Sequence, residues 1–334
     1  MKIISGWRSS KYLARVGIFL IITALITGIP VSYGVAGDDN QPSQNLEIYT
    51  WYDLDDVRDN LDGDHILMND LNATTPGYTL LASPTANGGK GWQPIGYSAV
   101  AGGGGCQSSP RPIIEYGLDG TFDGQGYEIH DLFINRFDEV YVGLFRYLNE
   151  GGIIKNVGLV DCNLYARGAV GSLVGRMRGS TISNCYSICT VRGGGNIGGL
   201  VGENWWGSTV SDSYSTASAT GDYWVGGLVG RNAGNINNSY ATGTVVSPHT
   251  VSGLVGITRD GTTSNSFWDT ETSGQATSDG GTGKNTTEMQ DITTFSDAGW
   301  NITAVVNTTM RDPTYIWNIV NNVTYPFLSW QPIS

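Results

Sequence analysis

Apolar residues and glycines form a short pattern that recurs along the middle of the chain. In its fullest form the pattern reads apolar, Gly, Gly, Leu, Val, Gly, and it occupies residues 142–145, 170–175, 197–202, 225–230 and 251–256. Four copies place a leucine at the same position, 27, 28 and 26 residues apart: Leu173, Leu200, Leu228 and Leu254. Such a regular period predicts a solenoid, in which each repeat forms one coil and buries its apolar residues against its neighbours.

A second column of residues follows each copy at a constant distance. It holds an aromatic residue two positions after a polar one, and the aromatic residues are Tyr186, Tyr214, Tyr240 and Phe267. The polar positions are Asn184, Asp212, Asn238 and Asn265, with Asn156 at the matching place one coil earlier. We expect coils about 4.8 Å apart that stack leucine on leucine and tyrosine on tyrosine around one apolar interior. The polar residues then form a ladder at a turn.

Composition favours strands over helices. The chain has 48 glycines and only 14 % charged residues, and glycine costs about 1 kcal/mol at a helical position. A leucine-rich horseshoe would need a helix in each repeat, and a propeller would need a unit of about 40 residues. We therefore predict an all-β fold, a single-stack parallel β-helix (solenoid) with coils of about 27 residues.

One short helical cap is predicted before the repeats. Leu54, Val57 and Leu61 fall on one face of a helix over residues 53–61, which would cover the open end of the solenoid. We expect an N-terminal cap and the first coils over residues 37–118. The repeats follow over residues 119–275, and a C-terminal capping region occupies residues 276–334.

The first 36 residues have the order of a targeting segment. Basic residues precede an apolar run over residues 16–31, and small residues follow it, as in a secretory signal. Cleavage of the signal and its retention as an N-terminal anchor both fit this order. We expect an exported protein, located at the cell surface or outside the cell. Membrane contact is expected only through this segment, if it stays uncleaved.

Charge and sequons describe the expected surface. The net charge is −12, which disfavours nucleic acid as a partner because two polyanions repel. Six N-x-[ST] sequons are candidates for glycosylation in a cell that modifies asparagine, at Asn72, Asn237, Asn285, Asn301, Asn307 and Asn322.

The repeats resemble those of the GLUG-motif family of adhesin-like bacterial and archaeal surface proteins. The flanking segments at residues 92–96, 120–126, 267–270 and 325–331 also look like the opening and closing parts of such proteins. The resemblance covers roughly residues 48–331 and implies export and a β-helix. It implies no particular chemistry, since the motif occurs in adhesin-like proteins and also beside a protease in immunoglobulin A peptidases.

The sequence offers no strong candidate for catalysis or metal binding. Zinc spacing and a G-x-S-x-G turn are both missing, and Arg58 stands where a calcium loop over residues 58–63 would need its first acidic ligand. We expect no catalytic residue, no metal and no cofactor. If Leu164 stacks on Val191, then Cys162 lies opposite Cys189, and an oxidising compartment would permit a disulfide there.

Four aromatic residues are the candidate ligand-binding residues. Trp205, Trp206, Tyr223 and Trp224 stand in or beside loops of neighbouring coils, where their rings could stack on sugars or fold onto the coil edge. The favoured function is a non-catalytic surface module with an adhesive or cell-envelope role, whose partners are extracellular glycans or proteins. Two alternatives stay open: a carbohydrate-active β-helix enzyme (polysaccharide lyase or hydrolase) and an accessory domain of a secreted peptidase system.

Overall fold

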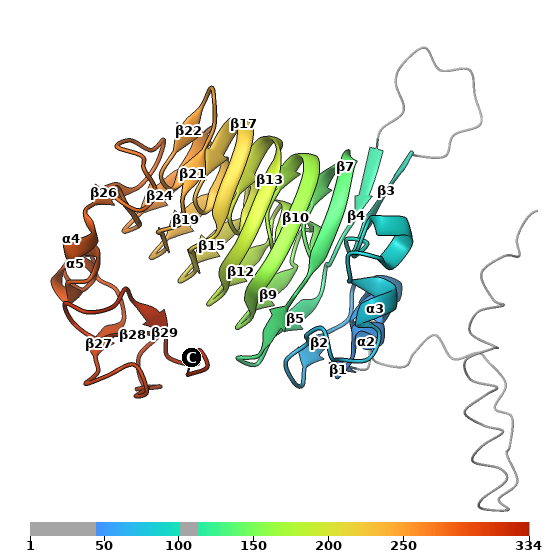
Figure 1. The fold of residues 1–334 in the computed structure, drawn as a ribbon, viewed down its shortest axis with the longest axis horizontal. Helices are drawn as coiled ribbons and strands as arrows, with labels where there is room; N and C mark the ends of the chain where they lie inside the picture. Colours follow the sequence, from blue (N-terminus) through green and yellow to red (C-terminus); the bar gives the residue numbers. More distant parts are fainter. Residues whose placement is uncertain (1–44, 101–112, 334) are drawn as a thin grey trace, which may run out of the picture. The chain divides into compact units, whose positions relative to one another are not determined.

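The computed structural model describes residues 45–100 and 113–333, all within one compact unit over residues 43–334 (Figure 1). The predicted targeting segment at residues 1–36 lies outside the described residues. Within the described ranges, no helix combines the length and the hydropathy that a membrane span requires.

Three sheets of parallel strands surround one core, and this confirms the predicted parallel β-helix. Five successive coils contribute strands to all three sheets, and equivalent residues of successive coils are hydrogen-bonded in register. On the third sheet, for example, Val174 pairs with Val201, Val201 with Val229, and Val229 with Val255. Figure 1 shows strands of the first and second sheets side by side along the solenoid.

The first sheet has eight short strands, and in its five central strands the middle residue points into the core. A continuous column of buried branched side chains runs through Ile154, Ile182, Val210 and Ile236. In spatial order the strands are β1 (Leu46–Ile48), β2 (His65–Leu67), β5 (Thr121–Asp123), β9 (Ile153–Lys155), β12 (Thr181–Ser183), β15 (Thr209–Ser211), β19 (Asn235–Asn237) and β24 (Thr262–Ser264).

The second sheet has eleven strands and includes the longest elements of the chain. Its central strands alternate between buried and more exposed residues, as expected for strands with one face on a core. The strands are β6 (Glu128–His130), β7 (Phe133–Val142), β10 (Gly158–Val170), β13 (Tyr186–Gly198), β16 (Tyr214–Ser215), β17 (Ser218–Gly226), β20 (Tyr240–Ala241), β21 (Val245–Val246), β22 (Val251–Ser252), β25 (Phe267–Asp269) and β26 (Thr282–Lys284).

The third sheet has five strands, each beginning after the leucine of a motif copy. Leu173, Leu200, Leu228 and Leu254 precede four of these strands and are at most 1 % exposed within the shared core. The strands are β8 (Phe145–Leu148), β11 (Val174–Met177), β14 (Val201–Asn204), β18 (Val229–Asn232) and β23 (Val255–Thr258).

Helical turns and a hairpin cover the N-terminal part of the solenoid. Helix α2 (Trp51–Asp56) continues into η1 (Val57–Asp59), and Thr50 and Asp53 form a capping box at its start. Leu54 and Val57 are fully buried, in agreement with the predicted apolar face. The other elements of this part are α3 (Tyr78–Leu81), η2 (Ala86–Gly89) and an antiparallel hairpin of β3 (Tyr97–Val100) and β4 (Ile113–Tyr116).

The sequence predicted that the tyrosine column would lie in the shared interior. In the structure it lies on the outer face of the second sheet. Tyr186, Tyr214 and Tyr240 stack with ring centroids 5.1 and 4.9 Å apart and belong to a separate apolar cluster. The reason is the period of two along a strand: the residue after each tyrosine, such as Ser187 or Ser215, points inward and is fully buried.

The C-terminal region covers this outward column instead of acting only as an end cap. Residues up to β26 close the last coil, where Ser278 accepts hydrogen bonds from the backbone of Leu254 and Val255. The chain then folds back along the flank, and Tyr240 donates to the carbonyl of Pro326 over 2.5 Å. This flank segment contains α4 (Thr286–Met289), α5 (Ile292–Ser296), β27 (Ile302–Ala304), β28 (Trp317–Ile319) and β29 (Phe327–Leu328).

The polar column occupies the turn between the first and second sheets. All five members have a left-handed backbone with φ between 45° and 55°: Asn156, Asn184, Asp212, Asn238 and Asn265. Asn and Asp tolerate this region better than other residues with a side chain. One amide of the column also bonds to the next, since Asn184 Nδ2 donates to Asn156 Oδ1 over 3.3 Å. Asn and Asp therefore occupy this column mainly because the turn needs a left-handed backbone. The hydrogen bond between neighbouring amides is a secondary contribution.

A buried asparagine pair forms a further ladder that the sequence did not suggest. Asn204 and Asn232 are fully buried at the end of β14 and β18, and Asn204 Nδ2 donates to Asn232 Oδ1 over 2.8 Å. Both amides also donate to backbone carbonyls of the following coil, those of Asn235 and Thr262. These bonds satisfy both amide nitrogens and Asn232 Oδ1, whereas Asn204 Oδ1 is buried without a partner.

The last glycine of the motif is required by the neighbouring coil. A Cβ at Gly230 would lie 2.3 Å from the carbonyl carbon of Asn196, and one at Gly202 would lie 2.6 Å from that of Ala169. Both obstacles are backbone atoms of the previous coil, which cannot move without breaking the register. A Cβ at Gly195, by contrast, would meet nothing closer than 3.6 Å.

Replacing Gly230 by Ala should lower the free energy of unfolding by about 1–3 kcal/mol, because the added methyl group forces two coils apart. Urea denaturation followed by circular dichroism measures the change. Gly195→Ala is the matched control and should unfold at or slightly above the wild-type denaturant concentration, since alanine suits a strand better than glycine. Equal stability of the two variants would contradict the close-packing explanation.

Replacing Asp212 by Asn should raise the free energy of unfolding at pH 7. Burial raises the pKa of Asp212, so the folded state disfavours its charged form. Asn removes that cost and also tolerates the left-handed backbone. The difference between variant and wild type should shrink as the pH falls through the raised pKa, because the carboxyl group is then neutral in the wild type too. Denaturation series at several pH values test this, and a gain that does not depend on pH would contradict it.

Candidate functional site

Charged side chains that follow the last glycine of three motif copies occupy the outer face of the third sheet. Arg176, Glu203 and Arg231 are register partners on β11, β14 and β18. The next residue of each strand is fully buried, so the period of two directs these three side chains outward. They were not predicted as site residues, although the sequence pattern L-V-G followed by a charged residue could have identified them.

The indole of Trp205 folds back from its turn onto this face. The guanidinium of Arg176 lies 4.2 Å from its ring centroid and that of Arg231 lies 4.8 Å away, and the two arginines come from the coils on either side of the Trp205 coil. The indole nitrogen donates to Glu203 Oε2 over 2.7 Å. Trp205 is thereby fixed between two cations by cation–π contacts and one charge-assisted hydrogen bond.

Glu203 is the central acceptor of this cluster and is only 4 % exposed. Besides Trp205, it accepts a hydrogen bond from Asn196 Nδ2, and it lies 3.6 Å from Arg176 Nε. Arg176 also pairs with Glu115 of the β3–β4 hairpin over 2.9 Å. In the described chain, neither of these two carboxylates lies within ion-pair distance of Arg231.

Arg231 has no carboxylate within ion-pair distance among the described residues. Its Nε is buried without a hydrogen-bond partner, as is Oδ1 of Asn196. Arg178 and Arg259 occupy equivalent turn positions three coils apart. Both are exposed and also form no ion pair within the described chain. Arg176, Arg178, Glu203, Trp205, Arg231 and Arg259 are together called the arginine face.

The four predicted aromatic residues separate into two pairs on opposite edges of the third sheet. Trp205 and Trp206 contact each other edge to face with centroids 5.4 Å apart, and Trp206 is 59 % exposed. Tyr223 lies 6.3 Å from Trp224 and stacks on His249 at 4.5 Å. No ring contact joins the two pairs in the part of the chain that the structure describes. Of the four, only Trp205 belongs to the arginine face, and Trp206 contacts it.

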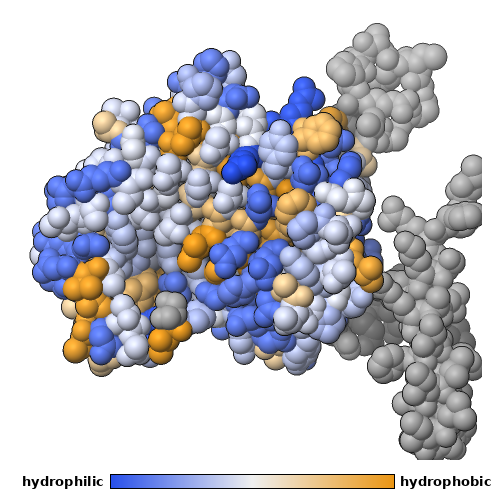
Figure 2. Space-filling view, in the orientation of Figure 1, coloured by the Kyte–Doolittle hydropathy of each residue, from blue (hydrophilic) through white to orange (hydrophobic). Residues whose placement is uncertain are grey.

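Apolar groups are scattered on the side of the molecule that Figure 2 shows. There, orange apolar residues form separate groups among hydrophilic ones. Large continuous apolar patches usually mark contacts with other proteins or membranes, and this side offers none.

The predicted disulfide is wrong, although the predicted register is correct. Leu164 pairs with Val191 and Cys162 pairs with Cys189 in neighbouring strands, yet both cysteines are buried free thiols. Stacked parallel residues send their Cα–Cβ bonds in the same direction, whereas a disulfide needs the two to converge. Burial raises the pKa of Cys162, so its thiol stays protonated and unreactive. Cys185 is likewise buried and free.

The six sequons differ in accessibility. Asn285, Asn301, Asn307 and Asn322 are exposed and lie in the flank segment, whereas Asn72 and Asn237 are half-buried. Asn72 Oδ1 also accepts hydrogen bonds from the backbone and hydroxyl groups of Thr74. Glycosylation thus remains a prediction, for which the flank segment offers the accessible acceptors.

No group of three or more His, Cys, Asp or Glu side chains is placed to hold a metal ion within the described ranges. In the stretch that resembled a calcium loop, Arg58 pairs with Asp55 over 2.5 Å. Further along the same stretch, Asp64 accepts a hydrogen bond from the backbone N–H of Thr121.

The family model of the GLUG motif matches residues 223–246. This segment contains the motif copy at residues 225–230 and its neighbouring turns. The chain therefore carries GLUG repeats on a parallel β-helix, which confirms what the sequence resemblance indicated.

Two relatives fit a GLUG-repeat surface protein. A protein of Evansella cellulosilytica, provisionally named a Gly-rich membrane protein, is 30% identical over 178 residues, which cover 51% of this chain and 18% of the relative. Halomucin of Haloquadratum walsbyi is 32% identical over 126 residues, which cover 38% of this chain and 1% of the relative. The chain thus spans only a small part of the length of both relatives.

A solved structure shares the fold. It is a Bacteroides ovatus protein, provisionally named an immunoglobulin A1 protease, with a TM-score of 0.57 over 87% of this chain and 94% of that chain. The two sequences are 18% identical, so the likeness concerns the fold alone.

Replacing Glu203 by Gln should lower the free energy of unfolding by about 1–3 kcal/mol. The negative charge of Glu203 beside Arg176 would be lost. The two guanidinium groups on either side of Trp205 would then have less negative charge near them. Chemical denaturation at pH 7 measures this effect. Glu150→Gln, at an exposed turn of the same chain, should change stability by less than about 0.5 kcal/mol. A Glu203 variant as stable as this control would show that the cluster has no structural role.

Proposed function

We propose that this chain is a non-catalytic recognition module of a surface protein, which binds acidic polysaccharides through the arginine face. The observation that supports this most directly is Arg231, a cation held on Trp205 with no carboxylate partner among the described residues. An unpaired, preorganised guanidinium suits a carboxylate or sulfate group, to which it can donate two parallel hydrogen bonds.

The position of these cations within an acidic protein strengthens the proposal. The chain has a net charge of −12, yet Arg178, Arg231 and Arg259 stand on one side of the solenoid without ion-pair partners in the described chain. Unpaired positive charges on such a protein attract anions locally while the rest of the surface repels them. Several weak contacts at the fixed spacing of the coils would then add up along one polymer chain.

Trp206 supplies the second element that sugar recognition needs. Its ring is 59 % exposed and is held edge to face by Trp205, so it is presented beside the arginines with little loss of freedom on binding. Flat aromatic rings offer an apolar surface on which the face of a sugar ring can stack. Charge recognition by arginine and stacking on Trp206 would act on the same polymer.

Surface location is supported by the relatives and by the N-terminal sequence. One relative is named as a membrane protein, and the basic, apolar and small-residue order of residues 1–36 fits export. Since the chain covers 18% and 1% of the two relatives, the activities and partners of those proteins as wholes say nothing direct about this module.

The alternative of a carbohydrate-active enzyme has less support. Glycoside hydrolysis needs two available carboxyl groups about 5–9.5 Å apart. Glu203, the carboxylate on the arginine face, is 4 % exposed and already accepts hydrogen bonds from Trp205 and Asn196. An accessory role in a peptidase system is supported only by likeness of fold.

Alginate, a polymer of uronic acids, is the probe for this proposal, and dextran is the neutral comparison. The wild-type protein should bind alginate and not dextran in affinity electrophoresis, and binding should weaken as salt is raised. Arg231→Gln should weaken alginate binding roughly tenfold, as expected for the loss of one charge-assisted contact.

Arg192→Gln is the matched control, because Arg192 is an exposed arginine of the second sheet and also forms no ion pair within the described ranges. It changes the net charge equally but should leave alginate binding within about twofold of wild type. Equal losses in the two variants would reduce the effect to net charge and would overturn the assignment of the site. Absence of alginate binding by the wild type would overturn the proposal itself.

A further inference from the structure

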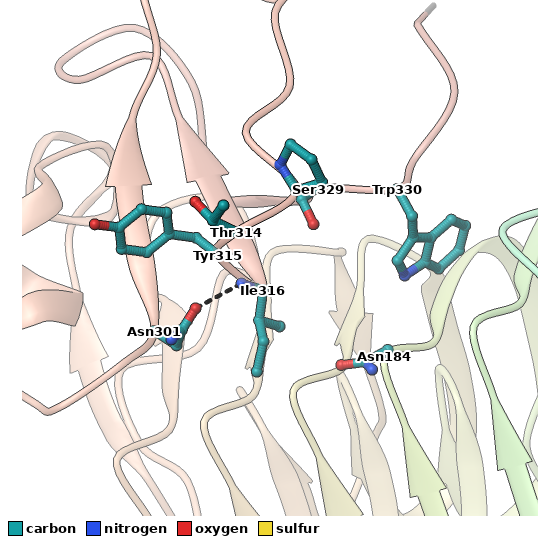
Figure 3. A pocket seen from close by; sticks show the side chains of 8 residues that line it. Asn184, Asn301, Thr314, Tyr315, Ile316, Ser329 and Trp330 are labelled. Carbon is teal, nitrogen blue, oxygen red and sulfur yellow. Dashed lines mark hydrogen bonds between the residues drawn. The ribbon is translucent and has the colours of Figure 1, made fainter.

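A small pocket lies where the flank segment meets the turn of the second coil of the solenoid (Figure 3). Its volume is about 230 Å³, and it is open to solvent on one side. One wall comes from the polar column, through Asn184, and the others come from the flank segment. The lining residues are Asn184, Asn301, Pro313, Thr314, Tyr315, Ile316, Ser329 and Trp330.

The indole nitrogen of Trp330 is the unusual group of this pocket. It is buried, and it donates to no acceptor in the described chain. Figure 3 shows it on the side of the ring that faces Asn184. Tryptophan N–H groups usually find a partner when buried, because a lost hydrogen bond costs free energy. A ligand oxygen in the pocket would supply the missing acceptor.

Asn184 provides a hydrogen-bond acceptor on the opposite wall of the pocket. Its Nδ2 donates to Asn156 Oδ1 over 3.3 Å, which orients the amide, and its Oδ1 accepts no hydrogen bond from the described residues. The left-handed backbone at Asn184 and the coil stacking on each side hold it in place. Donor and acceptor groups therefore face the same space from two separately fixed elements.

The residues that line the pocket are uncharged, in contrast to those of the arginine face. None of its eight lining residues is ionisable near neutral pH, and the carboxamide of Asn301 is already engaged by the backbone N–H of Ile316 over 2.7 Å. Trp330 contributes flat aromatic surface, and Thr314 and Ser329 contribute hydroxyl groups. Such a lining suits a small, uncharged ligand. The ligand would have a ring with faces of low polarity, and it would carry several hydroxyl groups.

We propose that this pocket binds one neutral pyranose ring, with a sugar oxygen accepting from Trp330 Nε1 and a sugar hydroxyl donating to Asn184 Oδ1. The site is independent of the arginine face in position, in charge and in the residues that form it. Binding of a neutral sugar here can therefore succeed or fail whatever the outcome with alginate.

Saturation-transfer NMR on residues 37–334 tests the proposal with glucose, galactose, mannose and N-acetylglucosamine, and with glucuronate as the charged comparison. At least one neutral sugar should bind with a Kd of about 1–10 mM, the range expected for a single ring in an open pocket. Trp330→Phe keeps an aromatic ring at this position but removes the Nε1–H donor, and it should weaken binding roughly tenfold.

Asn184→Gly is the second variant, because glycine adopts the left-handed backbone of this position and has no side-chain acceptor. It removes the proposed contact with the sugar hydroxyl, and binding should again weaken at least fivefold. Asn265→Gly, in the same column but outside the pocket, is the control and should bind as wild type does. No binding to any of the four neutral sugars, or binding unchanged in both pocket variants, would overturn the proposal.

Discussion

Hydrogen bonding of each coil to the next, in register, is the constraint on which this structure depends. It fixes the distance between equivalent residues, so that each position in the repeat becomes a column along the solenoid. The columns Leu173 to Leu254 and Ile154 to Ile236 fill the interior because every member faces the same slot as its neighbour. One coil alone could not bury these side chains, and stability therefore belongs to the stack.

The same constraint explains the glycines and the polar turn residues of the motif. Where coils approach most closely, backbone atoms of one coil occupy the place of a Cβ in the next, as Asn196 does for Gly230. Where the chain turns from the first sheet to the second, a left-handed residue is needed in each coil, and Asn or Asp fills it. The motif is thus a record of steric requirements, and it carries no chemistry by itself. Chemistry can differ from one copy to another only at outward positions, which is where Arg176, Glu203 and Arg231 stand.

The solenoid, its period, the pairing of Cys162 with Cys189 and the apolar face of the first helix could all be predicted, because each follows from spacing along the sequence. The outward direction of Tyr186 and Tyr214 could not, because apolar aromatic residues suit either a core or a covered surface. What covers them comes from residues more than 100 positions further along the chain, such as Trp330 on Tyr186 and Gln331 on Tyr214, and no local pattern encodes those contacts. The arginine face escaped prediction for a related reason: Trp205 was read as a loop aromatic, and its contact with arginines of two other coils depends on stacking.

Two outer faces of the solenoid are used in different ways, and this difference determines where recognition can occur. The second sheet presents tyrosines, and the flank segment buries them through Trp300, Trp317 and Leu328, so that the tyrosine part of this face is closed. The third sheet presents charges, and the half-buried Trp205 orders them without hiding Arg231. Closing the tyrosine face also brings Trp330 against the turn at Asn184 and so creates the uncharged pocket. Two sites of opposite character therefore arise from one repeat, because the flank segment covers one face and leaves another open.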